Sequence, residues 1–158
     1  MRAVVQRVSA GAVAVDGVEK ARIGRGYVIL LGVGRGDAEE DARTLAARCA
    51  SLRVMEDAQG KMNLSLRDVG GSALVVSQFT LYADTTRGNR PAFTGAAPPE
   101  EAAPLYEAFL SRMREILGEE HVAAGEFRAM MSVTIVNDGP VTVLIECSTH
   151  NKLRSASS

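Results

Sequence analysis

Histidine, cysteine and tryptophan are scarce in this chain of 158 residues, which has two histidines, two cysteines and no tryptophan. Cys49 and Cys147 lie far apart in the sequence and match no metal-binding or redox spacing. His121 and His150 are too few for a multi-histidine metal site. The sequence therefore predicts neither a metal nor another cofactor, and it favours a reducing, cytoplasmic compartment.

Long apolar runs and a strong net charge are also missing. No apolar run is long enough to cross a bilayer, and the opening Met1-Arg2-Ala3-Val4 is unlike the start of a secretory signal. The net charge of −1 gives no general attraction for nucleic acid, so an RNA contact needs a local basic patch. We therefore expect neither a membrane nor DNA as a partner.

The common catalytic motifs are absent as well. The sequence contains no GxGxxG after a strand, no P-loop, no GxSxG and no HExxH. It offers no Ser-His-Asp set, because His121 lies in a connecting segment and His150 in the polar end of the chain. These absences argue against dinucleotide-binding enzymes, P-loop NTPases and zinc proteases.

Apolar residues make up 46% of the sequence, which is enough for the core of one domain. We assign this domain to residues 1–148 and expect the serine-rich residues 149–158 to form a disordered tail. Two helical stripes are expected, one capped by Asp37 and one after Pro99. Pro104 should lie in the first turn of the second helix or delay its start. Strands are expected at 2–8, 12–15, 18–23, 27–33 and 72–82. This mixture predicts an α/β (α+β) fold with two main helices.

A polar stretch, Asn137-Asp138-Gly139-Pro140-Val141-Thr142, interrupts an otherwise continuous strand pattern near the end of the chain. Asn-Asp-Gly-Pro is typical of a turn, so one interpretation is a hairpin loop. The other interpretation depends on the X-Pro bond, which can be cis at modest cost. Gly139-Pro140 could then present two carbonyls side by side as a rigid wall.

The remaining polar candidates are ambiguous on local pattern alone. Arg7 lies within a strand pattern, where it is either a surface arginine or one that reaches a buried polar partner. Thr80 reads as a strand threonine. Arg87 and Arg90 form the clearest basic patch, in a long loop near Phe93, which suits a nucleotide, although solvated loop arginines are commoner.

Two stretches together closely resemble the signature motifs of the D-aminoacyl-tRNA deacylases. They are Ser77-Gln78-Phe79-Thr80-Leu81 and the polar stretch at 137–142. Further similarity covers MRAVVQRVS at the start, GKMNLSL at 60–66 and RGNRPAF at 87–93. The resemblance thus spans nearly the whole chain except for about its last ten residues.

The resemblance implies a fold of mixed sheets that form a partly closed, barrel-like core, and a homodimer with two active sites at the subunit interface. Each site would combine the 77–81 stretch of one chain with Gly139 and Pro140 of the other. The Gly-Pro bond is expected to be cis, and its carbonyls would occupy the space that an L side chain needs. D-amino acids and glycine would be accepted. Arg7 matches the arginine that holds this motif in place, with Asn137 and Thr142 in supporting roles.

The implied reaction is hydrolysis of the ester between a D-amino acid and the terminal adenosine of tRNA. Ser77, Gln78, Phe79 and Thr80 would form the catalytic stretch, with backbone N–H groups near Phe79 and Thr80 stabilising the oxyanion. The resemblance also implies that the 2′-hydroxyl of the terminal ribose helps to activate water, which fits a sequence with no usable histidine. The residues expected to contact tRNA or its adenosine are Arg87, Arg90 and Met131.

One segment departs from the family pattern. At 125–131 the chain carries Arg128 where the family usually has glycine, and Met130 where an acidic residue is usual. These departures motivate a second hypothesis, an inactive tRNA- or nucleotide-binding module of the same fold. A third hypothesis is a relative that clears L-alanyl-tRNA, against which the intact Phe79 and Arg7 argue.

Overall fold

One long strand, β1 (Arg2–Val15), organises the structure, a computed structural model that describes residues 1–148. On one side, the first half of β1 pairs with β3 (Gly26–Gly32) and the second half with β2 (Val18–Ile23), both antiparallel. On its other side β1 pairs with β8 (Met131–Glu146) along nearly its whole length. The tail predicted at 149–158 lies outside the described residues.

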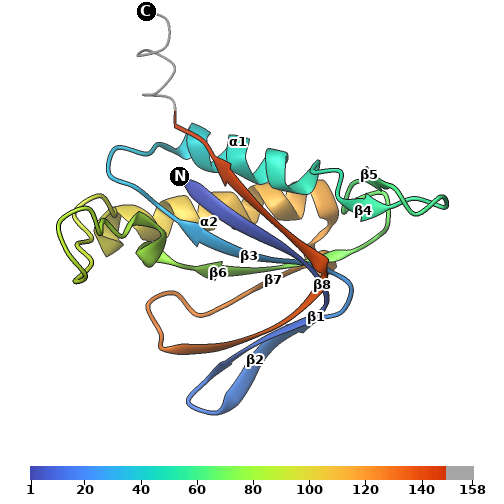
Figure 1. Cartoon of the computed structure of the whole chain (residues 1–158), viewed down its shortest axis with the longest axis horizontal. Helices are drawn as coiled ribbons and strands as arrows, with labels where there is room; N and C mark the ends of the chain where they lie inside the picture. The colour runs from blue at the N-terminus through green and yellow to red at the C-terminus, as the bar shows by residue number, and fades with distance from the viewer. Residues whose placement is uncertain (149–158) are drawn as a thin grey trace, which may run out of the picture.

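The sheet continues beyond β3 through two parallel neighbours, β6 (Ser72–Ser77) and β7 (Val122–Ala124). The strand order is β2-β1-β3-β6-β7, with β8 paired to β1 off this path, which gives six strands in all. The strands curve around a shared interior (Figure 1). The predicted mixed fold with a partly closed, barrel-like sheet and two main helices is confirmed. The remaining short elements are the hairpin strands β4 (Met55–Glu56) and β5 (Met62–Leu64) and the 3-10 helices η1 (Phe79–Tyr82) and η2 (Glu119–His121).

The two helices, α1 (Glu39–Ala50) and α2 (Pro99–Leu117), lie side by side over one face of the sheet (Figure 1). The main core contains buried residues of α1, of the apolar stripe of α2, which includes Phe109, and alternate residues of β3, among them Tyr27. The intervening residues of β3, such as Val28, pack into a second cluster on the opposite face. β3 is therefore buried on both faces, which explains its continuous apolar sequence.

The predictions for β1 and for Pro104 were wrong. The strands expected at 2–8 and 12–15 are one strand, β1. The break expected between them is present only as register shifts between Gln6 and Ala10 in the pairing of β1 with β8. Pro104 lies inside α2 rather than in its first turn. Proline has no backbone N–H, so α2 loses one hydrogen bond at this position. The loss is tolerated because the carbonyl that would accept this bond lies in the exposed first turn of the helix.

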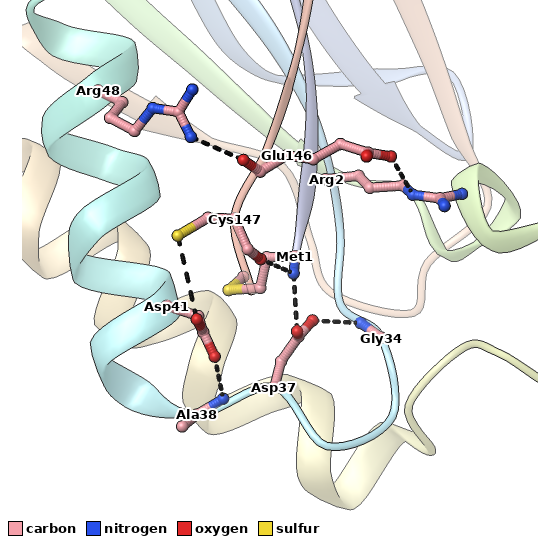
Figure 2. Close-up of polar contacts among 9 residues, drawn as sticks. All are labelled: Met1, Arg2, Gly34, Asp37, Ala38, Asp41, Arg48, Glu146 and Cys147. Atoms are coloured by element: carbon pink, nitrogen blue, oxygen red, sulfur yellow. Dashed lines mark hydrogen bonds and ion pairs between the residues drawn. The ribbon is translucent and has the colours of Figure 1, made fainter. Parts of the chain in front are cut away.

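Asp37 does not cap α1, contrary to the sequence-based expectation. The N-cap is Ala38, whose N–H donates to the Asp41 carboxylate at 2.9 Å. Asp37 instead lies 2.7 Å from the α-amino group of Met1 and accepts the N–H of Gly34 at 2.6 Å (Figure 2). Its carboxylate thus joins the start of β1 to the loop before α1, which local sequence could not reveal.

Asp37→Asn is expected to lower the free energy of unfolding by about 3 kcal/mol, because it leaves the buried amino group of Met1 without its counter-charge. The side chains of Met1 and Asp37 are 0% and 5% exposed, so solvent cannot replace the lost partner. Urea denaturation followed by circular dichroism measures the change. Asp16→Asn on the exposed β1–β2 turn makes the same chemical change as a control. Equal stability of the two variants would contradict the role given to Asp37.

Candidate active site

The chain leaves β6 at Ser77 and turns at once into the 3-10 helix η1. The predicted strand over 72–82 is therefore too long, and the interpretation of Thr80 as a strand threonine is wrong. The Gln78 N–H still bonds to the Leu31 carbonyl at 2.8 Å, and the Leu81 N–H then bonds to the Gln78 carbonyl at 3.2 Å. The turn leaves the Phe79 side chain 57% exposed, with Thr80 also exposed.

Arg2, the first residue of β1, holds η1 against the sheet. The Arg2 guanidinium donates to the Leu81 carbonyl at 2.9 Å and lies 4.6 Å from the centre of the Tyr82 ring. Burial raises the pKa of Tyr82, so its hydroxyl stays neutral at physiological pH. On the outer side, Gln78 donates to the Thr80 hydroxyl through Nε2. The Arg2 contacts thus connect η1 to β1, while the bond between Gln78 and Thr80 lies within the turn itself.

A cavity of about 360 Å³ opens beside η1, where the carboxyl ends of β3 and β6 meet the start of α2. Phe79 and Phe93 stand at its wall in edge-to-face contact, with ring centres 5.1 Å apart. The walls are apolar except for two arginines, Arg35 and Arg128, and the polar residues Ser77 and Gln78. The lining residues are Leu31, Val33, Arg35, Ser77, Gln78, Phe79, Phe93, Ala96, Ala97, Pro98, Pro99, Ala102, Tyr106, Phe127 and Arg128.

The cavity contains no residue suited to act as a base near neutral pH. Among the described residues its lining has no histidine and no carboxylate. Burial raises the pKa of Tyr106, whose hydroxyl donates to the Val75 carbonyl at 2.9 Å. Cys49 is buried in the core, which raises the pKa of its thiol to about 12, so it is no reactive nucleophile.

The polar stretch at 137–142 lies within β8 and does not reverse the chain, so the hairpin interpretation is wrong. Asn137 pairs with Val8 and Thr142 with Gln6, which leaves a bulge between them. The Gly139-Pro140 bond is cis, and Gly139 has a φ of 122°. Both residues are exposed, while the Asn137 and Thr142 side chains face each other at 3.5 Å.

Arg7 lies beneath this bulge and is only 5% exposed, so it reaches buried polar partners rather than solvent. It donates through Nε to the Asp138 carbonyl at 3.1 Å and through Nη1 to the Val54 carbonyl at 2.8 Å. The carboxylates of Asp138 and Glu56 lie 3.4 and 3.6 Å from its guanidinium nitrogens. Arg7 therefore connects the β8 bulge to the segment that precedes β4.

Within one chain the two motifs lie at opposite ends of the sheet. Val8 pairs with both Asn137 and Gly26, and Gly26 pairs with Ser72 at the start of β6. Ser77 is five residues further along β6, which corresponds to about 16 Å. In Figure 1 the bend of β8 and the segment that follows β6 lie at opposite ends of the sheet. The two motifs are therefore not in contact within one copy of the chain.

The other predicted site residues lie away from the cavity lining. Arg87 and Arg90 are exposed in the loop closed by the bridge between Asp84 and Ala92. Met131 starts β8 and packs against the second core cluster. The sequence interpretation missed Arg35, which follows the carboxyl end of β3. The parallel pairing of β3 with β6 brings this end beside Ser77, a relation that local pattern does not contain.

Two absences within the described residues concern metal sites and membrane-spanning helices. No group of three or more His, Cys, Asp or Glu residues in this part of the chain is arranged to hold a metal ion. No helix within residues 1–148 is long and apolar enough to span a membrane.

The fold and site define a small α+β domain with an apolar, arginine-bearing cavity at the ends of two parallel strands. The chain belongs to the D-Tyr-tRNA(Tyr) deacylase family, whose model matches residues 4–146. Two relatives named D-aminoacyl-tRNA deacylase come from Roseiflexus castenholzii and Anaeromyxobacter dehalogenans. They are 57% and 56% identical to this chain, covering 98% and 92% of it and 98% and 97% of their own lengths.

Solved structures confirm the fold. The structure named c-Myc DNA Unwinding Element Binding Protein superposes with a TM-score of 0.90 at 40% identity, covering 94% of this chain and 100% of its own. A second, titled as a probable eukaryotic D-amino acid tRNA deacylase, gives a TM-score of 0.78 at 20% identity, covering 92% and 98%. The second match concerns the fold alone.

Proposed function

We propose that this protein hydrolyses the ester bond of D-aminoacyl-tRNA and releases the D-amino acid and free tRNA. The observation that carries this proposal is the position of Ser77, Gln78 and Phe79, which line an apolar cavity beside two arginines. An aromatic and basic cavity suits the terminal adenosine of tRNA. The relatives named D-aminoacyl-tRNA deacylase support the same reaction. With tRNA as the substrate, the enzyme would act in the cytoplasm.

The active form is a homodimer in this proposal. A single copy separates η1 from the Gly139-Pro140 bulge by the length of β6. This separation supports a site in which a second copy supplies the bulge. The Gly139-Pro140 edge is exposed, as a surface that reaches into a partner's site must be. Two equivalent sites per dimer follow from the two-fold symmetry of such a contact.

Chirality is selected by lack of space. Gly139 offers backbone rather than a side chain, and Arg7 holds the neighbouring Asp138 carbonyl at 3.1 Å. An edge fixed in this way would collide with an L side chain while the D side chain points elsewhere. Glycyl-tRNA has no side chain to reject, so it should also be hydrolysed.

Catalysis depends on backbone donors in this proposal. The N–H groups of Phe79 and Thr80 begin η1, and neither bonds to a backbone carbonyl in the described part of the chain. Each could donate to the oxyanion of the tetrahedral intermediate, a contribution of roughly 3–4 kcal/mol. In this proposal the ribose 2′-hydroxyl of the substrate helps to activate water, which fits a cavity lining without a base. Ser77 and Gln78 shape the pocket around the reacting ester.

Thr80→Ala is expected to lower kcat by about fivefold to tenfold, because it removes one hydrogen bond to Gln78 and leaves the backbone donors in place. If Thr80 were the nucleophile, the loss would be roughly 10⁵-fold or more. Single-turnover hydrolysis of D-tyrosyl-tRNA separates these outcomes. Thr86→Ala in the exposed 83–98 loop serves as a control for loss of a threonine side chain.

The test of the proposed function compares D-tyrosyl-tRNA with L-tyrosyl-tRNA on the purified protein. We expect release of D-tyrosine while the L-ester remains intact, with glycyl-tRNA also cleaved. Equal rates on the D- and L-esters, or none on either, would overturn the proposal. Tight tRNA binding without turnover would instead favour an inactive binding module. Preferential cleavage of L-alanyl-tRNA over D-alanyl-tRNA would favour the third hypothesis.

A further inference from the structure

The cavity beside η1 is opposite in charge to the chain as a whole. Its lining contains Arg35 and Arg128 and, within the described residues, no carboxylate, whereas the whole chain has a net charge of −1. Aromatic rings from Phe79, Phe93 and Phe127 form part of the same wall. A complementary ligand therefore combines a flat apolar body with an anionic group, and a nucleotide has both.

Arg128 occupies a backbone position that suits glycine better than arginine. Its φ is 67°, in the left-handed region that side chains disfavour, in the turn between β7 and β8. Its side chain has no hydrogen bond or ion pair recorded within residues 1–148. Folding therefore gives no reason for an arginine here, and the exposed guanidinium remains available to a ligand.

Arg35 also lines the cavity, three residues after the end of β3. Its Nε donates to the Thr94 carbonyl at 2.8 Å, and its backbone N–H donates to the Gly95 carbonyl at 3.0 Å. These two bonds fix the guanidinium against the 83–98 loop. In the described part of the chain, its terminal nitrogens have no recorded partner, so they can still donate to an anion.

We propose that Arg128, together with Arg35, binds the phosphodiester that precedes the terminal adenosine of tRNA. This inference rests on the proposed function, because that function puts the adenosine in the cavity. The planar guanidinium can hold two phosphate oxygens at once, which a lysine cannot do. The RNA strand would then leave the cavity between the 83–98 loop and the β7–β8 turn.

The test measures kcat/KM for D-tyrosyl-tRNA at several salt concentrations. Arg128→Gly should lower this value about tenfold at low salt and reduce the slope of log kcat/KM against log salt by about 0.7, as expected for one lost contact to a single strand. Arg128→Lys should retain most of the slope. Arg67→Gln removes a charge at the opposite end of β6 and serves as the matched control. Thermal unfolding should show that Arg128→Gly is at least as stable as the wild type.

A substrate without the phosphodiester separates phosphate binding from a change in cavity shape. On 3′-O-D-tyrosyl-adenosine, Arg128→Gly should reduce kcat/KM less than about twofold. Equal losses on both substrates, or equal losses in Arg128→Gly and Arg67→Gln, would overturn the inference. A wild type that cleaves neither ester would overturn the proposed function alone. In that case calorimetry tests the inference. Adenosine 5′-monophosphate should bind the wild type more tightly than adenosine does, whereas Arg128→Gly should bind the two ligands equally. Equal binding of the two ligands to the wild type would overturn the inference.

Discussion

Gly139→Ala is expected to lower kcat/KM for D-tyrosyl-tRNA at least 100-fold, a size typical of a misplaced group near a reacting centre. A Cβ on Gly139 would lie 2.8 Å from Val141 Cγ2 and 2.9 Å from Arg7 Nη2, and the φ of 122° already disfavours a side chain. The bulge must therefore shift, and the proposed substrate-facing edge shifts with it. Steady-state hydrolysis measures the loss.

Gly17→Ala is the matched control for this prediction. Gly17 also has a positive φ, 76°, but a Cβ there would meet nothing within 4 Å. The control should lose roughly 1 kcal/mol of stability from the left-handed backbone and keep its activity. If Gly139→Ala kept wild-type rates and wild-type preference for the D-ester, the role proposed for the bulge would be wrong.

Arg7→Ala is expected to reduce both stability and chiral selectivity. The change leaves the Asp138 and Val54 carbonyls without their donor and removes the cation from two nearby carboxylates. We expect a loss of about 3 kcal/mol in the free energy of unfolding. This corresponds to a Tm lower by roughly 6–12 °C. The ratio of kcat/KM for the D- over the L-ester should fall about tenfold or more, because the Asp138 carbonyl is no longer held.

Two further variants show whether the geometry of the Arg7 side chain matters as well as its charge. Arg7→Lys keeps the charge but cannot donate to the Asp138 and Val54 carbonyls from one planar group, so an intermediate effect is expected. Arg22→Ala, which removes an exposed arginine paired with Glu19, should leave Tm and selectivity unchanged. Full selectivity in a folded Arg7→Ala variant would refute the proposed support of the bulge by Arg7.

The periodic apolar pattern was sufficient to predict those helices and strands that bury one regular face. β3, β2 and the stripe of α2 were predicted close to their observed bounds, since burial on a sheet or helix imposes a period on the sequence. The same reasoning failed at 77–82, where strand-like residues form η1. A Cβ on Gly32 would lie 3.1 Å from the Gln78 carbonyl. This close approach belongs to the tertiary structure, and no local pattern encodes it.

The candidate site was likewise predictable from the sequence only in part. The two motifs at 77–81 and 137–142 were recognisable in the sequence, because each is a continuous stretch that resembles a signature motif of the D-aminoacyl-tRNA deacylases. The cavity was not recognisable, because it unites residues from the ends of β3 and β6, the start of α2 and the β7–β8 turn. The separation of the two motifs along the sheet is likewise a consequence of strand register rather than of composition.

The sequence by itself determined the class of fold, the main helices and the two polar motifs, because these depend on residues close together in the chain. The family resemblance already implied that Arg7 holds the Gly139-Pro140 stretch, but only the tertiary structure decided its partners, the carbonyls of Asp138, 131 positions away, and of Val54. It also decided that Arg35 and Arg128 share one cavity. The physical reason is that hydrogen bonds and charges act through space, while local sequence pattern records only which side chains avoid water.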